Sequence, residues 1–266
     1  MVHLVETRPS PGVYGFARED LTWRGTEKKG MQLAAVRASR ESGQFLGYLL
    51  FERFSETGVH QHLGPAFSYF LDGGLTDFQG TAKAGEVGIN LEGATHTAIA
   101  YRPTLAASRL EAPVIYPSED SVRGEVLHTG ATAPPDGGEI VNANPEVMPD
   151  INVDLEALPW QGTQVAGLQR RMVFDYAQTE FARRHAELRL LPYTRVPPFR
   201  TTAALDVFVI GGDLSFNDER QGAGGFFVVD DGTEVHMSTQ YGCLCLVWSE
   251  GPVAWQDRAR SDPFGF

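Results

Sequence analysis

An internal repeat constrains the fold of this 266-residue chain more than any other sequence feature. The hexapeptide LTWRGT recurs as LPWQGT, which pairs Trp23 with Trp160. Further along, YFLDGG recurs as VFVIGG, which pairs Gly73 with Gly211 at nearly the same separation. A nearly constant separation over about fifty residues indicates duplication of one structural unit. The sequence therefore predicts two similar domains in tandem.

The predicted domains consist of short β-strands. The chain contains 29 glycines and 16 prolines, which favours many strands and turns over long helices. Residues 180–191 have helical propensity, but the repeat aligns them with a strand of the first copy, and we predict a strand there. The strands predicted in the first copy are residues 31–38, 44–54, 59–63, 66–71, 76–82 and 86–91, with 97–101 and 112–116 closing the domain.

The predicted domain boundaries follow composition. Residues 1–128 form the first domain, in which residues 1–20 are an N-terminal arm. Residues 129–157 contain paired prolines and glycines and too few apolar side chains for a core, so we predict a linker. Residues 158–266 form the second domain.

Three histidines in the first copy predict a metal site. His60 and His62 are two residues apart in a predicted strand, so their side chains point to the same face. Two glycine turns and an apolar strand separate them from His96. Imidazole is the commonest protein metal ligand, and three imidazoles on adjacent strands can hold one divalent ion with positions left open for a substrate.

The motifs around these histidines resemble those of the cupin superfamily. The sequences HQHLGP, FLDG and GATHT are most similar to two groups: the dioxygenases that cleave acetylacetone and dihydroxyacetophenone, and the cupin domain of ChrR-type anti-sigma factors. The resemblance implies an all-β bicupin, with two tandem double-stranded β-helix (jelly-roll) barrels and the metal in the mouth of the first. Most cupins place a glutamate where this chain has Ala66 or Phe67, which predicts a site of three histidines without a carboxylate.

The first functional hypothesis is a non-haem Fe(II)-dependent dioxygenase. In the dioxygenases that the chain resembles, a small β-dicarbonyl or hydroxyketone chelates the metal, O2 reacts, and a carbon–carbon bond breaks. Phe67 and Phe70 are candidate pocket walls, because their strand follows the ligands. The candidate catalytic residues, which would orient ligands or transfer a proton, are Tyr69, Glu52 and Glu92.

Two alternatives remain open. Zn(II), Mn(II) or Ni(II) at the same three histidines would suit a lyase, isomerase or hydrolase without redox chemistry. The resemblance to ChrR also allows a sensor or regulatory protein. The anti-sigma proteins pair their barrel with a zinc-holding helical domain, and no such sequence precedes residue 20 here.

The second copy is predicted to be degenerate. No histidine occurs in the segment VPPFR that corresponds to the first histidine pair, and His236 lies at about the place of His96. We predict a domain kept for packing, with a metal-free pocket formed by His236 and Arg200 as the minor alternative. Cys243 and Cys245 are expected to be buried free thiols, because residues at this spacing in a strand cannot readily bridge each other.

Charge and hydropathy exclude some partners. The formal net charge is −12, and no basic run interleaved with aromatic residues appears, so no nucleic-acid partner is expected. No apolar run is long enough to span a bilayer, and the N-terminus has no signal-peptide core. We expect a cytoplasmic protein that binds a small chelating substrate and O2, and the resemblance to cupins implies a homodimer.

Overall fold

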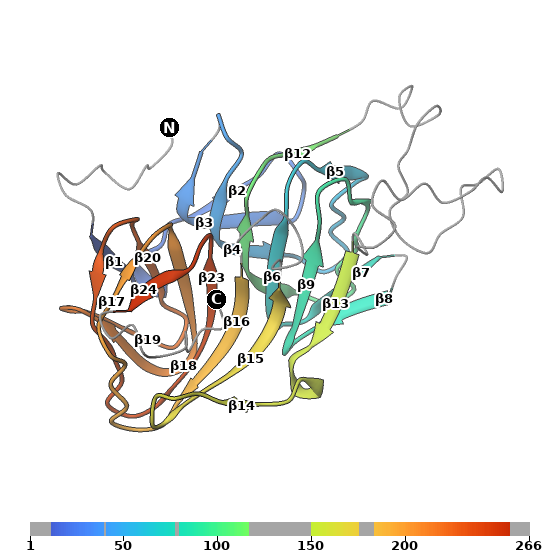
Figure 1. The fold of residues 1–266 in the computed structure, drawn as a ribbon. Coiled ribbons are helices and arrows are strands. Elements are labelled where there is room, and N and C mark those ends of the chain that lie inside the picture. The colour runs from blue at the N-terminus through green and yellow to red at the C-terminus, as the bar shows by residue number, and fades with distance from the viewer. Residues whose placement is uncertain (1–11, 40, 78–79, 117–149, 176–183, 256–266) are drawn as a thin grey trace. The chain divides into compact units, whose positions relative to one another are not determined.

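The computed structural model describes residues 12–39, 41–77, 80–116, 150–175 and 184–255, and these residues form two compact all-β units (Figure 1). The first unit comprises the described residues between Thr22 and Glu156, and the second comprises those up to Leu21 and those from Ala157 onward. Within the described residues, no helix is both long and apolar enough to cross a membrane.

The first unit contains a large sheet, a small sheet and a hairpin, all antiparallel. The seven strands of its large sheet lie in the order β13 (Asp150–Asp154), β9 (Glu86–Asn90), β6 (Ala66–Asp72), β11 (Thr104–Leu110), β4 (Phe45–Phe51), β3 (Met31–Ala38) and β2 (Trp23–Gly25). Its small sheet has the order β10 (Thr95–His96), β5 (His60–His62) and β12 (Val114–Ile115), and its hairpin consists of β7 (Gly74–Asp77) and β8 (Gly80–Lys83).

The second unit repeats this plan. Its large sheet has the order β1 (Val13–Phe16), β20 (Phe226–Val229), β18 (Leu205–Phe216), β23 (Cys243–Ser249), β16 (Arg184–Leu190), β15 (Leu168–Asp175) and β14 (Gln161–Gly162), with β19 (Glu219–Gly222) and β22 (Met237–Ser238) paired to β18. Its small sheet has the order β21 (Glu234–Val235), β17 (Phe199–Thr201) and β24 (Val253–Trp255). Two short 3-10 helices, η1 (Arg18–Asp20) and η2 (Leu155–Ala157), precede β2 and β14.

Side-chain hydrogen bonds at the start of each repeat agree with the duplication. The hydroxyl of Thr26 lies 3.2 Å from the carbonyl oxygen of Lys28, and the hydroxyl of Thr163 lies 3.3 Å from that of Val165. Each threonine is the third residue after the tryptophan of its repeat. The alignment deduced from sequence therefore holds for the turns that follow β2 and β14.

Farther along, the strand register corrects the alignment by one residue. Phe70 pairs with Ala106 in the first unit, and the equivalent pair in the second unit is Val209 with Cys245. In each unit a β-bulge follows this pair along the strand, and a glycine with positive φ follows the bulge: Gly73 (φ +72°) in the first unit and Gly212 (φ +79°) in the second. Gly73 therefore corresponds to Gly212 and not to Gly211.

The first strand of each repeat lies in the unit formed by the other repeat. β1, which precedes β2 in the chain, pairs with β20 of the second unit. β13, which precedes β14, pairs with β9 of the first unit. The segment expected to be an arm of the first domain thus supplies an edge strand to the second unit. The end of the predicted linker supplies an edge strand to the first unit, while residues 117–149 lie outside the described residues.

Two local strand predictions were wrong. The single strand predicted at 76–82 is replaced by two paired strands, β7 and β8, and residues 97–101 contain only an isolated bridge at Ile99. The strand that lies between β4 and β6 is β11, which the sequence analysis missed. Two alanines lie at the centre of β11, and alanine is depleted in strands, so pairing on both sides determines its conformation. The strand predicted at 180–191 is present as β16, and its first residues lie outside the described ranges.

The second unit has a continuous apolar core between its large and small sheets. Residues of the small sheet, including Phe199 and Val235, pack in one cluster with residues of β18, β20 and β23. Cys243 and Cys245 belong to this cluster and are free thiols, as predicted.

Candidate metal centre

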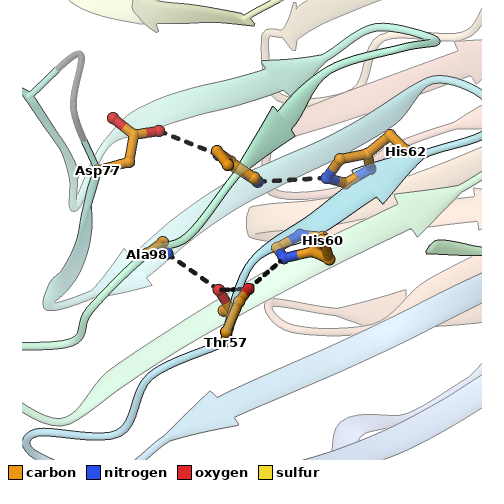
Figure 2. A network of polar contacts seen from close by, with 7 residues as sticks. Thr57, His60, His62, Asp77 and Ala98 are labelled. Carbon is orange, nitrogen blue, oxygen red and sulfur yellow. Dashed lines mark hydrogen bonds and ion pairs between the residues drawn. The ribbon is translucent and has the colours of Figure 1, made fainter. Parts of the chain in front are cut away.

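Three imidazole rings of the first unit converge on one point. β10 pairs antiparallel with β5, so that His96 lies directly opposite His60, and His62 follows two residues along the same face of β5. The ring centroids are 4.7 Å apart for His60 and His96, 5.0 Å for His60 and His62, and 5.3 Å for His62 and His96. The structure therefore brings together the three histidines that the sequence predicted, and Figure 2 shows His60 and His62 among them.

A backbone carbonyl orients the first ring. The Nδ1 atom of His60 lies 2.9 Å from the carbonyl oxygen of Gly58, which also accepts a hydrogen bond from the hydroxyl of Thr57 at 3.2 Å. The backbone N–H of Ala98 donates to that hydroxyl in turn (Figure 2). With Nδ1 donating to a carbonyl, Nε2 of His60 carries the lone pair.

A carboxylate orients the third ring. The Nδ1 atom of His96 lies 3.1 Å from Oδ2 of Asp77, and the two side chains are only 9% and 14% exposed. Asp77 ends β7, and the sequence analysis did not single it out, because it lies far from His96 in the sequence and no motif links them. A carboxylate on the outer nitrogen of a ligating histidine sets the tautomer and raises the basicity of the ligand.

The donor set is of the kind that binds a divalent metal ion, and one pair of its nitrogens has the separation that coordination requires. The Nε2 atoms of His62 and His96 are 3.3 Å apart, and the three ligand nitrogens all lie within 4.8 Å of one another. Two nitrogens bound to one ion at about 2.1 Å are separated by roughly 3.0–3.4 Å for angles near 90–110°. No carboxylate belongs to this group among the described residues, in agreement with the predicted three-histidine set.

Burial favours the neutral form of two of the ligands, His60 and His62. His60 and His62 are 7% and 5% exposed. Burial, together with the nearby His96, lowers the pKa of His60 to about 4, and burial lowers the pKa of His62 well below its usual range. Neutral imidazoles leave a bound cation with its full charge, so the site would attract an anionic chelating ligand.

The second unit has apolar side chains at the positions equivalent to His60, His96 and Asp77. Strand register aligns His60 with Phe199 and His96 with Val235, and the equivalent hairpins align Asp77 with Phe216. All three replacements are fully buried. His62 aligns with Thr201, whose hydroxyl donates to the carbonyl oxygen of Asp230 at 2.6 Å. The prediction that the second copy has lost its metal ligands is therefore consistent with this register.

His236 does not take the place of His96, as the sequence analysis had supposed. It follows Val235, and its side chain is 63% exposed, 3.8 Å from Glu234. The side chain of Arg200 is 60% exposed and pairs with the same glutamate. The minor alternative of a pocket built on these two residues is therefore not supported, because both lie on the surface.

The repeat also identifies the residues of the first unit that face the histidines. In the second unit, Val207, Val247, Phe227 and Val229 point from the large sheet into the core that contains Phe199 and Val235. Their equivalents in the first unit are small or polar: Ser68, Ser108, Gly88 and Asn90.

These residues leave the first unit less completely filled. The hydroxyls of Ser68 and Ser108 lie 2.8 Å apart. Ser68 and Asn90 retain partial exposure although their strands pair on both sides, whereas the equivalent Val207 and Val229 are fully buried. We conclude that solvent reaches a polar interior in the first unit.

The other predicted residues are placed as follows. Phe70 shares the face of β6 with Ser68, while Phe67 and Tyr69 point to the opposite face. Glu52 and Glu92 are exposed and do not belong to the histidine cluster. Their suggested catalytic roles remain predictions, and the carboxylate that contacts a histidine of the cluster is that of Asp77.

Comparisons with known proteins agree with this fold. Residues 14–107 match the family model of the ChrR cupin-like domain. A candidate dioxygenase from Nostoc punctiforme shares 10% identity with a TM-score of 0.66, over 89% of this chain and 82% of its own. A mutant of oxalate decarboxylase from Bacillus subtilis shares 11% identity with a TM-score of 0.62, over 94% of this chain and 81% of its own. No curated protein sequence matches the chain. The fold and the site define an all-β protein with a three-histidine group, part of whose chain is similar to the ChrR cupin-like domain.

Proposed function

We propose that this chain is a non-haem Fe(II)-dependent dioxygenase that cleaves a carbon–carbon bond in a small β-dicarbonyl or hydroxyketone. One observation carries the proposal: three imidazoles converge, two of them are buried, and two are oriented through their outer nitrogens. The fold likeness to a candidate dioxygenase supports it. A bound Fe(II) ion would supply Lewis acidity toward the substrate oxygens and electrons for O2.

The residues of the chain then have defined tasks. His60, His62 and His96 hold the ion, and Asp77 maintains the tautomer and orientation of His96. Ser68, Ser108 and Asn90 offer hydrogen-bonding groups to a substrate in the interior of the first unit.

Among the remaining candidates, the geometry favours Phe70. It packs with Ala82 and Ala106 on the face of β6 that carries Ser68, and this position suits a pocket wall. A wall of this kind would limit the size of the substrate and exclude water during the reaction.

We further propose that the two units are tandem cupin barrels, of which the second has lost its metal. The equivalent strand order of their large and small sheets supports this architecture. The second unit would then contribute packing, while catalysis is confined to the first unit.

Oxygen consumption tests the proposed reaction. Protein loaded with Fe(II) under anaerobic conditions is mixed with air-saturated buffer and a panel of β-diketones and hydroxyketones, and cleavage products are identified by mass spectrometry. We expect uptake with at least one compound, loss of uptake in His96→Ala, and no change in His236→Ala, which removes an exposed histidine of the second unit. Stoichiometric iron without uptake on any compound would refute the dioxygenase proposal.

An oxygen-independent lyase containing Mn(II) or Zn(II) is the second candidate. The fold likeness to oxalate decarboxylase over 94% of the chain favours it. Metal analysis of the protein as isolated, followed by turnover assays with and without oxygen, separates the two reactions. The ChrR cupin-like match keeps a regulatory role as a third candidate, which recovery of a transcription factor in a pull-down would support.

A further inference from the structure

We infer that Lys28 recognises a negatively charged oxygen of the ligand that binds at the three-histidine site. This inference rests on the proposed metal centre and narrows its substrates to small anions, such as a carboxylate or an enolate. It does not depend on the reaction being an oxygenation.

The repeat places the side chain of Lys28 at the entrance to the interior. Lys28 corresponds to Val165, because each follows the equivalent threonine and receives the same contact from its hydroxyl. Val165 is 6% exposed and belongs to the apolar core cluster that also contains Phe199, the equivalent of His60. A side chain that follows the same direction in the first unit points toward the histidines.

Contacts of the ammonium group agree with this direction. Nζ of Lys28 lies 3.0 Å from the position that a Cβ atom on Gly58 would occupy. Gly58 is the residue whose carbonyl oxygen orients His60. Nζ also lies 4.0 Å from the ring centroid of Tyr116, and that ring is 5.9 Å from the ring of His60. The cation–π contact with the ring of Tyr116 therefore holds the ammonium group of Lys28 beside His60.

The charge of Lys28 is available to a ligand. Among the described residues, no carboxylate forms an ion pair with its ammonium group, even though the chain carries a net charge of −12. The bound metal ion and the ammonium group of Lys28 are two positive charges at one site, so they favour a ligand that carries negative charge.

The geometry suits a small chelating anion. One end of the ligand would bind the ion on the three imidazoles, and a charged oxygen would accept a hydrogen bond from Lys28. Such charge-assisted hydrogen bonds are roughly twice as strong as neutral ones. A neutral molecule of the same shape would lose most of this interaction.

Binding of malonate and malonamide to Zn(II)-loaded protein tests the inference without redox chemistry. Both probes have the β-dicarbonyl shape, but only malonate is charged. Zinc content and circular dichroism are measured first for wild type, Lys28→Met, Lys28→Arg and Lys29→Met, and affinities are then measured by calorimetry. Lys29→Met is the matched control, because Lys29 is adjacent and exposed.

We expect wild type to bind malonate more tightly than malonamide, because the metal ion and Lys28 both attract its negative charge, and the share of Lys28 is the part of this preference that Lys28→Met loses. Lys28→Met should weaken malonate binding about tenfold and malonamide binding less than about twofold. Lys28→Arg should retain affinity within about threefold, because the charge is kept, and Lys29→Met should bind like wild type.

Equal malonate affinity in Lys28→Met and wild type would overturn the inference, as would equal binding of the two probes by wild type. Should the methionine variant fail to fold, Lys28→Gln removes the same charge with a polar side chain and takes its place in the comparison with wild type. A protein that takes up no zinc would overturn both this inference and the proposed function. Zinc uptake with the expected dependence on Lys28, but without oxygen consumption by the iron form, would refute the dioxygenase proposal alone.

Discussion

Removal of the carboxylate at position 77 should weaken metal binding without unfolding the protein. Oδ2 of Asp77 lies 3.1 Å from Nδ1 of His96, and both side chains are largely buried. A hydrogen bond to a charged group contributes about 1.5–3 kcal/mol. Loss of an outer partner of a ligating histidine typically costs about 10- to 100-fold in metal affinity, which corresponds to roughly 1.4–2.7 kcal/mol. The two ranges agree, and we expect Asp77→Ala to bind Zn(II) about 10- to 100-fold more weakly.

A second substitution separates charge from orientation. Asp77→Asn keeps an oxygen that can accept from Nδ1 but loses the charge, and charge-assisted hydrogen bonds are about twice as strong as neutral ones. We therefore expect about half the loss in binding free energy for Asp77→Asn. Competition with a chromophoric zinc chelator measures the affinities, and Asp218→Asn, an exposed aspartate of the second unit, serves as the control. Affinity unchanged in a folded Asp77→Ala protein would refute the reasoning.

Three further predictions follow from burial, backbone geometry and the interior of the first unit. Burial lowers the pKa of His60 from 6.5 to about 4, so between these pH values the unfolded chain binds a proton that the folded, metal-free protein excludes. The free energy of unfolding should therefore fall by up to about 3 kcal/mol as the pH decreases from 6.5 to about 4. Urea denaturation across that pH range should show a smaller decrease for His60→Asn, and an identical decrease would contradict the assigned cause. Gly73→Ala should destabilise the first unit by about 3 kcal/mol, because φ is +72° and a Cβ atom would lie 2.3 Å from the carbonyl oxygen of Pro103. Gly25→Ala is the control: its Cβ atom would meet no atom within 4 Å, so the free energy of unfolding should change by less than about 0.5 kcal/mol. Thermal denaturation measures both, and equal values would be inconsistent with the backbone argument. Ser68 and Ser108 can be replaced together by valine, which is the residue type at both equivalent positions of the second unit. The double variant should keep its fold and zinc content but bind malonate about tenfold more weakly. Undiminished malonate binding would exclude these hydroxyls from the ligand site.

The three ligands could be predicted from sequence because a strand places alternate residues on one face, which made His60 and His62 neighbours at once. His96 required only that a glycine-bounded strand return beside the first. Asp77 could not be predicted, because its contact with His96 depends on how the hairpin of β7 and β8 folds over the small sheet. Exposed glutamates such as Glu52 and Glu92 were nominated instead, since sequence spacing does not reveal burial.

The second copy illustrates a similar limit. Its loss of paired histidines was evident in the sequence, but His236 was assigned to the position of Val235. A shift of one residue along a strand exchanges its faces, and His236 lies one residue beyond the true equivalent of His96. Only the pairing of β17 with β21 determined which side chain points inward.

The sequence by itself determined that the chain is a duplicated all-β protein, that one copy carries a trio of imidazoles, and that the other does not. Repeats and two-residue periodicity are local properties, so they can be recognised without a fold. The tertiary structure decided the exchange of β1 and β13 between the repeats, the contact of Asp77 with His96, and the inward direction of Lys28. Each of these depends on pairing between segments far apart in the chain, and the free energy of such pairing comes from the packed structure as a whole.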